Sequence, residues 1–430
     1  MKLLRTDSEN YWAGVLCLTG FFLHILLSDP LLNALGVHYS GDEGKFYEKI
    51  HPGTILIFLS LLVLLAKGSN PIERFFAIAR EHAAFVVLLA LYVLLFLYMA
   101  ARSGFAGLAF IIDTHMSAAI CAIVLSYAPP SLCRKAVNFF IGASLVNGLI
   151  GIAEAIGKFR IFTFDPDWPV MHEQYFRASA FIGHPLDNAI FTSVALCVLL
   201  ALDYSRWIKN VATIIFMAAL VAFGGRASIV FSVGVLAVLA RANAWRVAGI
   251  GEITAAQAFT AAGVIVSIAL FCAVLFVLLT HSMIGERVAA SINWDESARS
   301  RLLAFRAFSY MNDEELWFGV PAGRIIAITA RMNLVMPLTE IENPWIMMCM
   351  NLGFITFPFW LAATIWFICH LGKNKPLALQ MAIAAYFMIA TLSNTFGRKD
   401  ANYAIMVCAV VCAGRLLNSS NFLPGLPVRR

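Results

Sequence analysis

Six arginines and no lysine occupy the longest polar stretch of the chain, residues 281–342, although the whole sequence contains ten lysines. The planar guanidinium group can bind phosphate oxygens through two parallel hydrogen bonds, which the ammonium group of lysine cannot do. The stretch therefore predicts a pyrophosphate or another anionic ligand. Eight acidic residues share it, so surface ion pairs are the alternative interpretation. The six residues are Arg287, Arg299, Arg301, Arg306, Arg324 and Arg331.

A seventh arginine, Arg226, lies in the short sequence Phe223-Gly224-Gly225-Arg226-Ala227-Ser228 between two strongly apolar segments. An unpaired arginine so close to hydrocarbon costs about 2.5–3.5 kcal/mol on insertion scales, so an anionic partner is expected. The alternative is that its side chain extends to ordinary lipid headgroups.

The segment from Arg177 to Asn188 carries a Gly-His-Pro sequence and leads directly into an apolar run. Pro185 prevents a helix from continuing across this point, so Asp187 and Asn188 fall in the first turn of a new helix, beside free backbone N–H groups. His184 then lies at the membrane edge, where an imidazole could act as an acid or a base. A structural histidine at a turn is the alternative.

The arginine-containing stretch ends with Glu342 and Asn343, just before Pro344 and another apolar run. A carboxylate at the edge of the membrane could accept a proton from a sugar hydroxyl as a general base. It could equally be an acidic residue favoured at a helix start by the helix dipole.

Three ionisable residues, Asp113, His115 and Glu154, lie within apolar runs. Such residues are candidates for function. Residues two apart do not face each other on a helix, so Asp113 and His115 predict a polar contact inside a bundle more readily than a proton relay.

The elements that position these residues are predicted from composition. The 430 residues are 61% hydrophobic and 13% charged, and the mean hydropathy is +0.81. Such a chain uses lipid as its main solvent. Apolar runs long enough for helices recur throughout it, which predicts an all-α, polytopic bundle of about 12 spans. The predicted spans are 11–28, 52–66, 83–101, 105–128, 136–156, 186–203, 208–224, 227–240, 257–280, 343–369, 377–394 and 401–418.

The short linkers predict the orientation, because lysine and arginine collect on the cytoplasmic side. A cytoplasmic N-terminus places most basic linkers in the cytoplasm, together with the C-terminus. The first span is interpreted as a retained anchor. Two long segments are then external and are predicted to carry function. The resulting organisation is N-terminal helices in 1–156, a loop in 157–185, central helices in 186–280, a large helical loop in 281–342, and C-terminal helices in 343–430.

Other classes of function lack their usual signatures. The nine cysteines lie almost wholly in apolar runs without a CxxC pair, which argues against disulfides, zinc and redox chemistry. Nucleotide-binding, metalloprotease and serine-hydrolase motifs are missing from the sequence, and so is an acidic pair suited to a nucleotide sugar. We therefore predict no metal, no cofactor and no nucleic-acid partner.

At these residues the chain resembles the bacterial O-antigen polymerase and ligase superfamily, and within it the exopolysaccharide polymerases. The likeness covers about the last 260 residues, and the motifs stand in the expected order. One departure is that the ligases carry histidine where this chain has Glu342. The matching segments are Arg177 to Asn188, Gly225-Arg226-Ala227-Ser228, Arg299-Ser300-Arg301-Leu302, Phe318 to Gly323, Glu342-Asn343 and Asn351-Leu352-Gly353.

The resemblance implies a metal-independent glycosyltransferase of the bacterial inner membrane with a periplasmic active site. It would transfer an undecaprenyl-diphosphate-linked glycan to an incoming lipid-linked repeat unit. Glu342 or His184 would activate the acceptor hydroxyl. Lipid, a flippase and a chain-length regulator of the same pathway would be its partners. The diphosphate or glycan would be bound by Arg177, Arg226, Arg299, Arg301, Arg306, Arg324 and Asn343.

Two other functions remain open. A ligase would make the same contacts with the donor and transfer the finished glycan to a different acceptor. A transporter or flippase would have a charged cavity near the bilayer midplane, for which Asp113 and His115 are the best candidates.

Overall fold

The computed structural model describes residues 10–39, 44–66, 70–105, 107–162, 176–248, 303–335, 341, 343–392, 397 and 399–420. Every regular element in these ranges is helical, as predicted. Five helices begin at a proline, a residue that suits the first helical position because the N–H group there has no acceptor within the helix.

Helices form at each predicted span that the structure describes. These are α1 (Tyr11–Leu26), α3 (Pro52–Ala66), α5 (Ala83–Ser103), α7 (Pro130–Gly157), α8 (Pro185–Ala201), α9 (Arg206–Phe223), α10 (Arg226–Ala248), α16 (Pro344–Gly372), α17 (Leu377–Ala390) and α18 (Asn402–Ser420). The predicted span 105–128 contains a π-helix, η2 (Ile111–Met116), followed by α6 (Ser117–Leu125). The predicted span 257–280 lies outside the described residues.

Shorter helices connect or flank the long ones. They are α2 (Asp29–Ala34), η1 (Phe46–Lys49), α4 (Pro71–Glu81), η4 (Ala304–Tyr310), α14 (Asp313–Phe318) and α15 (Ala322–Val335).

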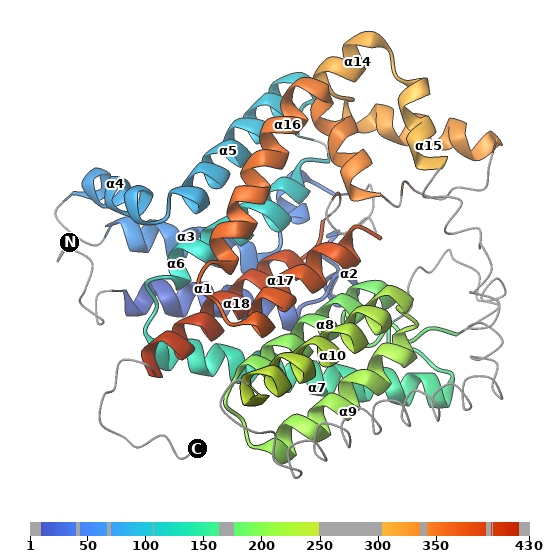
Figure 1. The fold of residues 1–430 in the computed structure, drawn as a ribbon. Coiled ribbons are helices and arrows are strands. Elements are labelled where there is room, and N and C mark those ends of the chain that lie inside the picture. Colours follow the sequence, from blue (N-terminus) through green and yellow to red (C-terminus); the bar gives the residue numbers. More distant parts are fainter. Residues whose placement is uncertain are drawn as a thin grey trace.

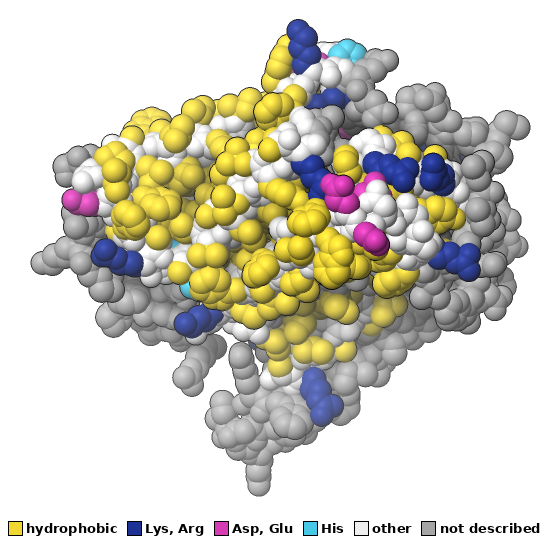
Figure 2. Space-filling model, turned by 90° about the horizontal axis from the view of Figure 1, so that it is seen from above, with side chains coloured by type: hydrophobic (Ala, Val, Ile, Leu, Met, Phe, Trp, Pro, Cys, Tyr) yellow, Lys and Arg dark blue, Asp and Glu magenta, His cyan; other side chains and the backbone are white. Residues whose placement is uncertain are grey.

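Among the described residues, four helices are long and apolar enough to cross a membrane: Ala83–Arg102, Pro130–Gly157, Arg206–Phe223 and Pro344–Gly372. Several shorter apolar helices accompany them, and α3 with α4 forms a bent pair that together could make one more span. Large apolar side chains face outward on α5, including Leu94 and Leu97. Figure 2 shows hydrophobic side chains over much of the described surface on one face. These features suit a lipid environment, and the span count of 12 remains a prediction.

Helix α18 lies at the centre of the bundle. It packs against α6, α7, α8 and α17, which surround it in Figure 1. All residues from Asn402 to Gly414 are buried. A helix buried on every side belongs to the interior of a large bundle, so α18 joins the N-terminal helices to the group α7 to α10.

The helix ends lie in two groups. At one end, which we call the loop end, the starts of α8, α10 and α18 meet the ends of α7 and α9; hydrogen bonds join Ala178 N–H to Ala222 O (3.1 Å) and Asn402 Nδ2 to Asp187 O (3.5 Å). At the opposite end, Arg415 Nη2 donates to Ala128 O (2.9 Å). Basic residues predicted to be cytoplasmic, such as Arg134 and Lys375, belong to this second end.

Helix α16 is interrupted at Gly353, which has a φ of 72°. There its backbone meets the chain that leaves α14. A Cβ atom on Gly353 would lie 2.4 Å from both Gly319 N and Trp317 O, and Val320 N–H donates to Met350 O (2.7 Å). Gly319 also has a positive φ, 88°. Two segments singled out by the family resemblance, Phe318 to Gly323 and Asn351 to Gly353, therefore contact each other through backbone, which only glycine permits.

We predict that Gly353→Ala lowers the free energy of unfolding by more than about 2 kcal/mol, because alanine would add both a positive-φ strain and a backbone clash. The midpoint of thermal unfolding of the purified protein in detergent measures this. Gly323→Ala in α15 is the matched control, since its Cβ would meet no atom within 4 Å. Equal midpoints for the two variants would contradict the prediction.

Candidate functional site

The segment 176–184 precedes α8 at the loop end and is held by a buried carboxylate. Glu154, in the last turn of α7, is fully buried. Its Oε2 accepts hydrogen bonds from Ser179 N–H (2.9 Å) and Ala180 N–H (2.8 Å), and its Oε1 accepts one from Ile161 N–H (2.8 Å). Three charge-assisted hydrogen bonds compensate for removing the carboxylate from water. Glu154 thus has a structural task that explains its place in an apolar run.

Two buried asparagines complete this support. Asn147 Oδ1 accepts from Phe181 N–H (3.0 Å), and its Nδ2 donates to Asn188 Oδ1 (2.7 Å). Asn188 Nδ2 in turn donates to Ser179 O (2.5 Å) and His184 O (2.9 Å). The asparagine that opens α8 therefore fixes the loop before it. Because its amide group is occupied in this way, Asn188 acts as a positioning residue.

We predict that Glu154→Gln destabilises the protein by about 1–3 kcal/mol, because an amide NH₂ group would face a backbone N–H group that now has a carboxylate acceptor. Thermal unfolding in detergent measures the change. The control is Glu73→Gln, where the exposed side chain accepts one hydrogen bond from Asn70 Nδ2 (3.1 Å). A Glu154→Gln protein as stable as the control would refute this role for the carboxylate.

Arg177 and Arg226 come from two different sequence motifs and are brought to the same place. The hydrogen bond from Ala178 N–H to Ala222 O sets the backbone of Arg177 beside the end of α9, and Arg226 begins α10 just after the turn. That turn is tight: Gly224 has a φ of 66°, and a Cβ on Gly225 would lie 2.6 Å from Ala189 Cβ. The Arg226 side chain is exposed and that of Arg177 is half-buried.

Two further cations lie beside Arg177. Arg160 donates from Nε (3.1 Å) and Nη2 (2.9 Å) to Arg177 O, and both Arg160 and Lys158 lie over the Phe176 ring. We call Lys158, Arg160, Arg177 and Arg226 the basic cluster. The sequence prediction did not include Lys158 and Arg160, although cations in an external linker break the charge rule just as Arg226 does.

His184 occupies the N-cap position of α8, and its side chain makes no capping hydrogen bond. Instead, its Nδ1 lies 3.4 Å from Asp187 Oδ2, one turn into the helix. Both side chains are partly accessible. A carboxylate beside one ring nitrogen orients an imidazole and leaves the other nitrogen for proton transfer, so the geometry is compatible with an acid or base.

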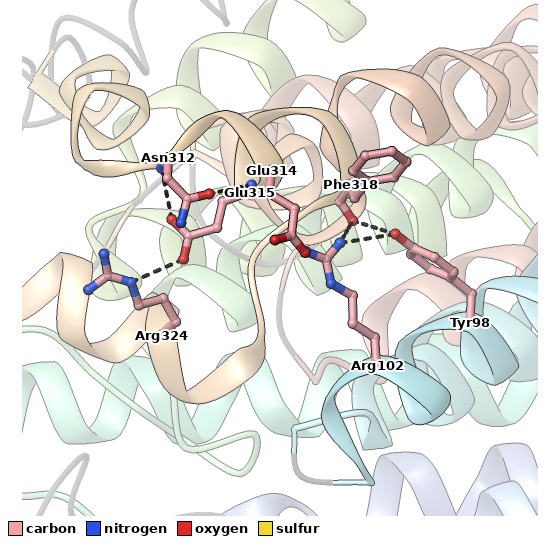
Figure 3. Close-up of polar contacts among 7 residues, drawn as sticks. All are labelled: Tyr98, Arg102, Asn312, Glu314, Glu315, Phe318 and Arg324. Atoms are coloured by element: carbon pink, nitrogen blue, oxygen red, sulfur yellow. Dashed lines mark hydrogen bonds and ion pairs between the residues drawn. The ribbon is translucent and has the colours of Figure 1, made fainter.

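Arg306, Arg324 and Asn343 belong to a separate part of the loop end. Here η4, α14 and α15 pack on the first half of α16 through a small apolar core that includes Ala307, Ile328 and Met350. Arg324 Nε donates to Glu315 Oε1 (3.1 Å), and Glu315 is also part of the capping box of α14 with Asn312 (Figure 3). For Arg324, the ion-pair interpretation of the sequence therefore accounts for the contact.

The other two residues of this group differ from Arg324. Asn343 caps α16, where its Oδ1 accepts from the N–H groups of Trp345 (3.0 Å) and Ile346 (3.1 Å). Arg306 is exposed. Of the three residues predicted to bind substrate, two thus have defined structural partners.

A polar contact attaches α14 to the end of α5 (Figure 3). Arg102 donates from Nη2 to Glu314 Oε1 (3.1 Å) and from Nη1 to Phe318 O (2.5 Å), and Tyr98 Oη donates to the same carbonyl (2.6 Å). The contact holds the chain just before Gly319, and so it supports the junction of α14 with α16.

The four candidate arginines that the structure describes therefore lie on two groups of helices rather than one. Figure 1 shows α14 at the top of the view and α15 to the right of α16, both away from α8 to α10, where the basic cluster lies. Among the residues that the structure describes, Arg306 and Arg324 do not join Arg177 and Arg226 in a single cavity. The predicted site residues Arg299, Arg301 and Glu342 lie outside the described residues.

A further group of polar residues surrounds Asp113, which is buried in the π-helix η2. Its carboxylate accepts from Tyr39 Oη (2.8 Å) and from His51 N–H (3.1 Å), and Lys399 Nζ lies 3.4 Å from the Tyr39 ring centroid and donates to Lys49 O (3.2 Å) and to Tyr39 O. His115 instead stacks on Tyr92. The two residues have different partners, in agreement with a polar contact inside the bundle.

Burial changes the proton affinity of the two basic groups in this part of the loop end. It lowers the pKa of His51 to about 4 and that of Lys399 to about 8, although Asp113 and Asp29 act against the shift of Lys399. At neutral pH, His51 is therefore neutral and Lys399 remains mainly protonated. Sequence reasoning missed Lys399. The sequence feature that could have indicated it is a pair of cations, Arg398 and Lys399, in a linker predicted to be external.

In comparisons with known proteins, no protein-family model, no curated protein and no solved structure matches this chain. The described helices, four of which are long and apolar enough to cross a membrane, indicate a helical membrane protein with its candidate functional residues at one end of the bundle.

Proposed function

We propose that this chain is a polysaccharide polymerase of the bacterial inner membrane. It would join repeat units carried on undecaprenyl diphosphate at the external face. The observation that carries the proposal is the position of Arg177 and Arg226, which come from two motifs of the family resemblance and lie at the same helix ends. Together with Lys158 and Arg160 they supply the positive charge that a diphosphate requires.

In the proposed reaction, a hydroxyl of the incoming lipid-linked unit attacks the anomeric carbon of the growing glycan. A new glycosidic C–O bond forms as the bond from that carbon to the diphosphate oxygen breaks. The hydroxyl proton passes to His184 or Glu342, and the electron pair leaves with undecaprenyl diphosphate. Negative charge grows on the leaving group, so arginines already in place stabilise the transition state without a metal.

The location also suits the substrate. Arg226 begins a helix that follows an apolar span, and its side chain is exposed at the helix ends. A polyprenyl chain can remain in lipid while its diphosphate reaches this level. The charge pattern of the linkers supports an external position for the same end, because the opposite end carries most of the basic residues.

A transporter of lipid-linked sugars is the second candidate, and one observation favours it. Asp113, Lys399 and Tyr39 form a buried polar contact between distant parts of the chain, as expected of a coupling site. A ligase remains equally compatible with the basic cluster, since it differs from a polymerase only in its acceptor.

The test of the proposal is complementation of a native host that lacks this protein, with the size distribution of undecaprenyl-linked glycans as the measurement. We expect single repeat units to accumulate without the protein. Arg226→Ala should lower polymer formation by about 10²–10³-fold, because it removes a group that stabilises the leaving diphosphate. Arg226→Lys should recover part of this loss, since lysine keeps the charge without the bidentate geometry.

The matched control is Arg241→Ala, which removes an exposed arginine from the same helix at its opposite end. It should leave polymer length unchanged at equal protein level. Long lipid-linked chains that lack their final acceptor would indicate a ligase, and repeat units retained on the cytoplasmic side would indicate a flippase. Either result would rule out the polymerase.

A further inference from the structure

A small cavity opens at the loop end between the end of α1, the start of α2, the segment before α8 and the start of α18. Its volume is about 40 Å³, room for about three water-sized groups. Ile25, Ile182 and Ile405 form its apolar walls. Its polar lining consists of His24, Ser28, Asp29, Lys399, Asp400 and Asn402.

Several of the polar atoms in this lining are buried without a partner. Ser28 Oγ, Asn402 Oδ1 and His24 Nδ1 have no hydrogen bond to any described residue, and the three residues are 6%, 4% and 5% exposed. Buried polar groups in folded proteins almost always have a hydrogen-bond partner. The three residues line the same cavity, so polar groups bound there are the nearest partners that could satisfy these atoms.

The charges of the lining select the chemistry of those groups. Asp29 and Asp400 face one cation, Lys399, whose ammonium group already donates to Tyr39 O and Lys49 O. This balance disfavours a phosphate group. Hydroxyl groups fit, because each one can donate to a carboxylate or amide oxygen and accept from a donor at the same time. The cavity is too small for a whole sugar ring and admits one or two hydroxyl-bearing carbons.

The cavity is built against the segment that carries His184. Ile182 lines it, and Gly183 packs on the start of α2 so closely that a Cβ would lie 2.2 Å from Pro30 Cγ. From the other side, Asn402 Nδ2 donates to Asp187 O (3.5 Å), in the residue that pairs with His184. The cavity therefore lies against the segment that ends at His184, and Asn402 connects it to the backbone of Asp187.

We propose that this cavity is the acceptor subsite, which holds hydroxyl groups of the terminal sugar of the incoming repeat unit beside the His184 and Asp187 pair. The inference rests on the proposed function for the reaction, and on the unpartnered polar atoms for the binding. The basic cluster then binds the donor diphosphate, and the net acidic cavity binds neutral sugar. The two halves of the substrate are separated by charge.

The first test uses the full chain in lipid nanodiscs with lipid-linked repeat units extracted from a host that lacks it. Ser28→Val and Asn402→Leu remove the polar atoms at similar volume. Each should raise the acceptor concentration needed for half-maximal polymerisation by about 5–20-fold, the effect of losing one or two hydrogen bonds, with a smaller change in maximal rate. The control is Ser144→Val, where the lost hydroxyl is buried but donates within its own helix to Phe140 O (2.7 Å).

The second test does not depend on polymerisation. Asp29→Cys, at a partly accessible position in the cavity lining, is labelled with a membrane-impermeant methanethiosulfonate, with and without the free oligosaccharide released from the same repeat units, and the wild-type chain gives the background. We expect the oligosaccharide to slow labelling at least threefold. A simple phosphate salt at the same concentration should give no protection.

The outcomes separate the two proposals. If Ser28→Val and Asn402→Leu behave like Ser144→Val and the oligosaccharide gives no protection, the cavity holds structural water only and the subsite is overturned. If the wild-type chain makes no polymer, the proposed function fails. The labelling result then decides the inference by itself: protection supports a sugar-binding cavity, and its absence overturns it.

Discussion

The structure depends on how non-helical backbone is stabilised at the ends of apolar helices. Peptide groups that leave a helix near lipid lose their partners, and water is not freely available to replace them. At the segment before α8, the replacement comes from side chains of neighbouring helices: the Glu154 carboxylate accepts hydrogen bonds from three backbone N–H groups, and Asn147 accepts one from Phe181 N–H. Asn188 Nδ2 donates to the carbonyl oxygens of Ser179 and His184. Every candidate residue on that segment, from Arg177 to His184, takes its place from this arrangement.

The same requirement is met differently at α16. There the helix breaks at Gly353, and the exposed backbone approaches the backbone around Gly319. Here two glycines have the role that the carboxylate and the amides have before α8, because two backbone segments can approach this closely only without Cβ atoms. Both solutions use residues that stand out in the sequence, which is why structural and catalytic motifs are difficult to separate in this chain.

The helices could be predicted from sequence because hydrophobic length and proline positions are local properties. Even the short segment 52–66 became α3 with the expected bounds. The candidate site was predicted only in part. Arg177 and Arg226 were singled out from their motifs, but their position at the same helix ends comes from the contact of Ala178 with Ala222. The contacts of Arg324 with Glu315 and of Asn343 with its own helix likewise cannot be predicted from spacing. The cavity beside Lys399 is lined by three separate segments of the chain, 24–29, the residue Ile182 and 399–405, so no single stretch of sequence could indicate it.

The position of α18 has a consequence for how the protein is made. This helix is the last that the structure describes, yet it fills the centre of the bundle and is buried on all sides along most of its length. Helices α6, α7, α8 and α17, which all pack against α18, emerge from the ribosome earlier. The earlier helices are therefore inserted into the membrane before the bundle can pack fully. The polar groups near the start of α18, which complete the loop end, are synthesised after them. The site at that end forms only after synthesis of the chain through α18, so no shorter nascent chain holds a complete site.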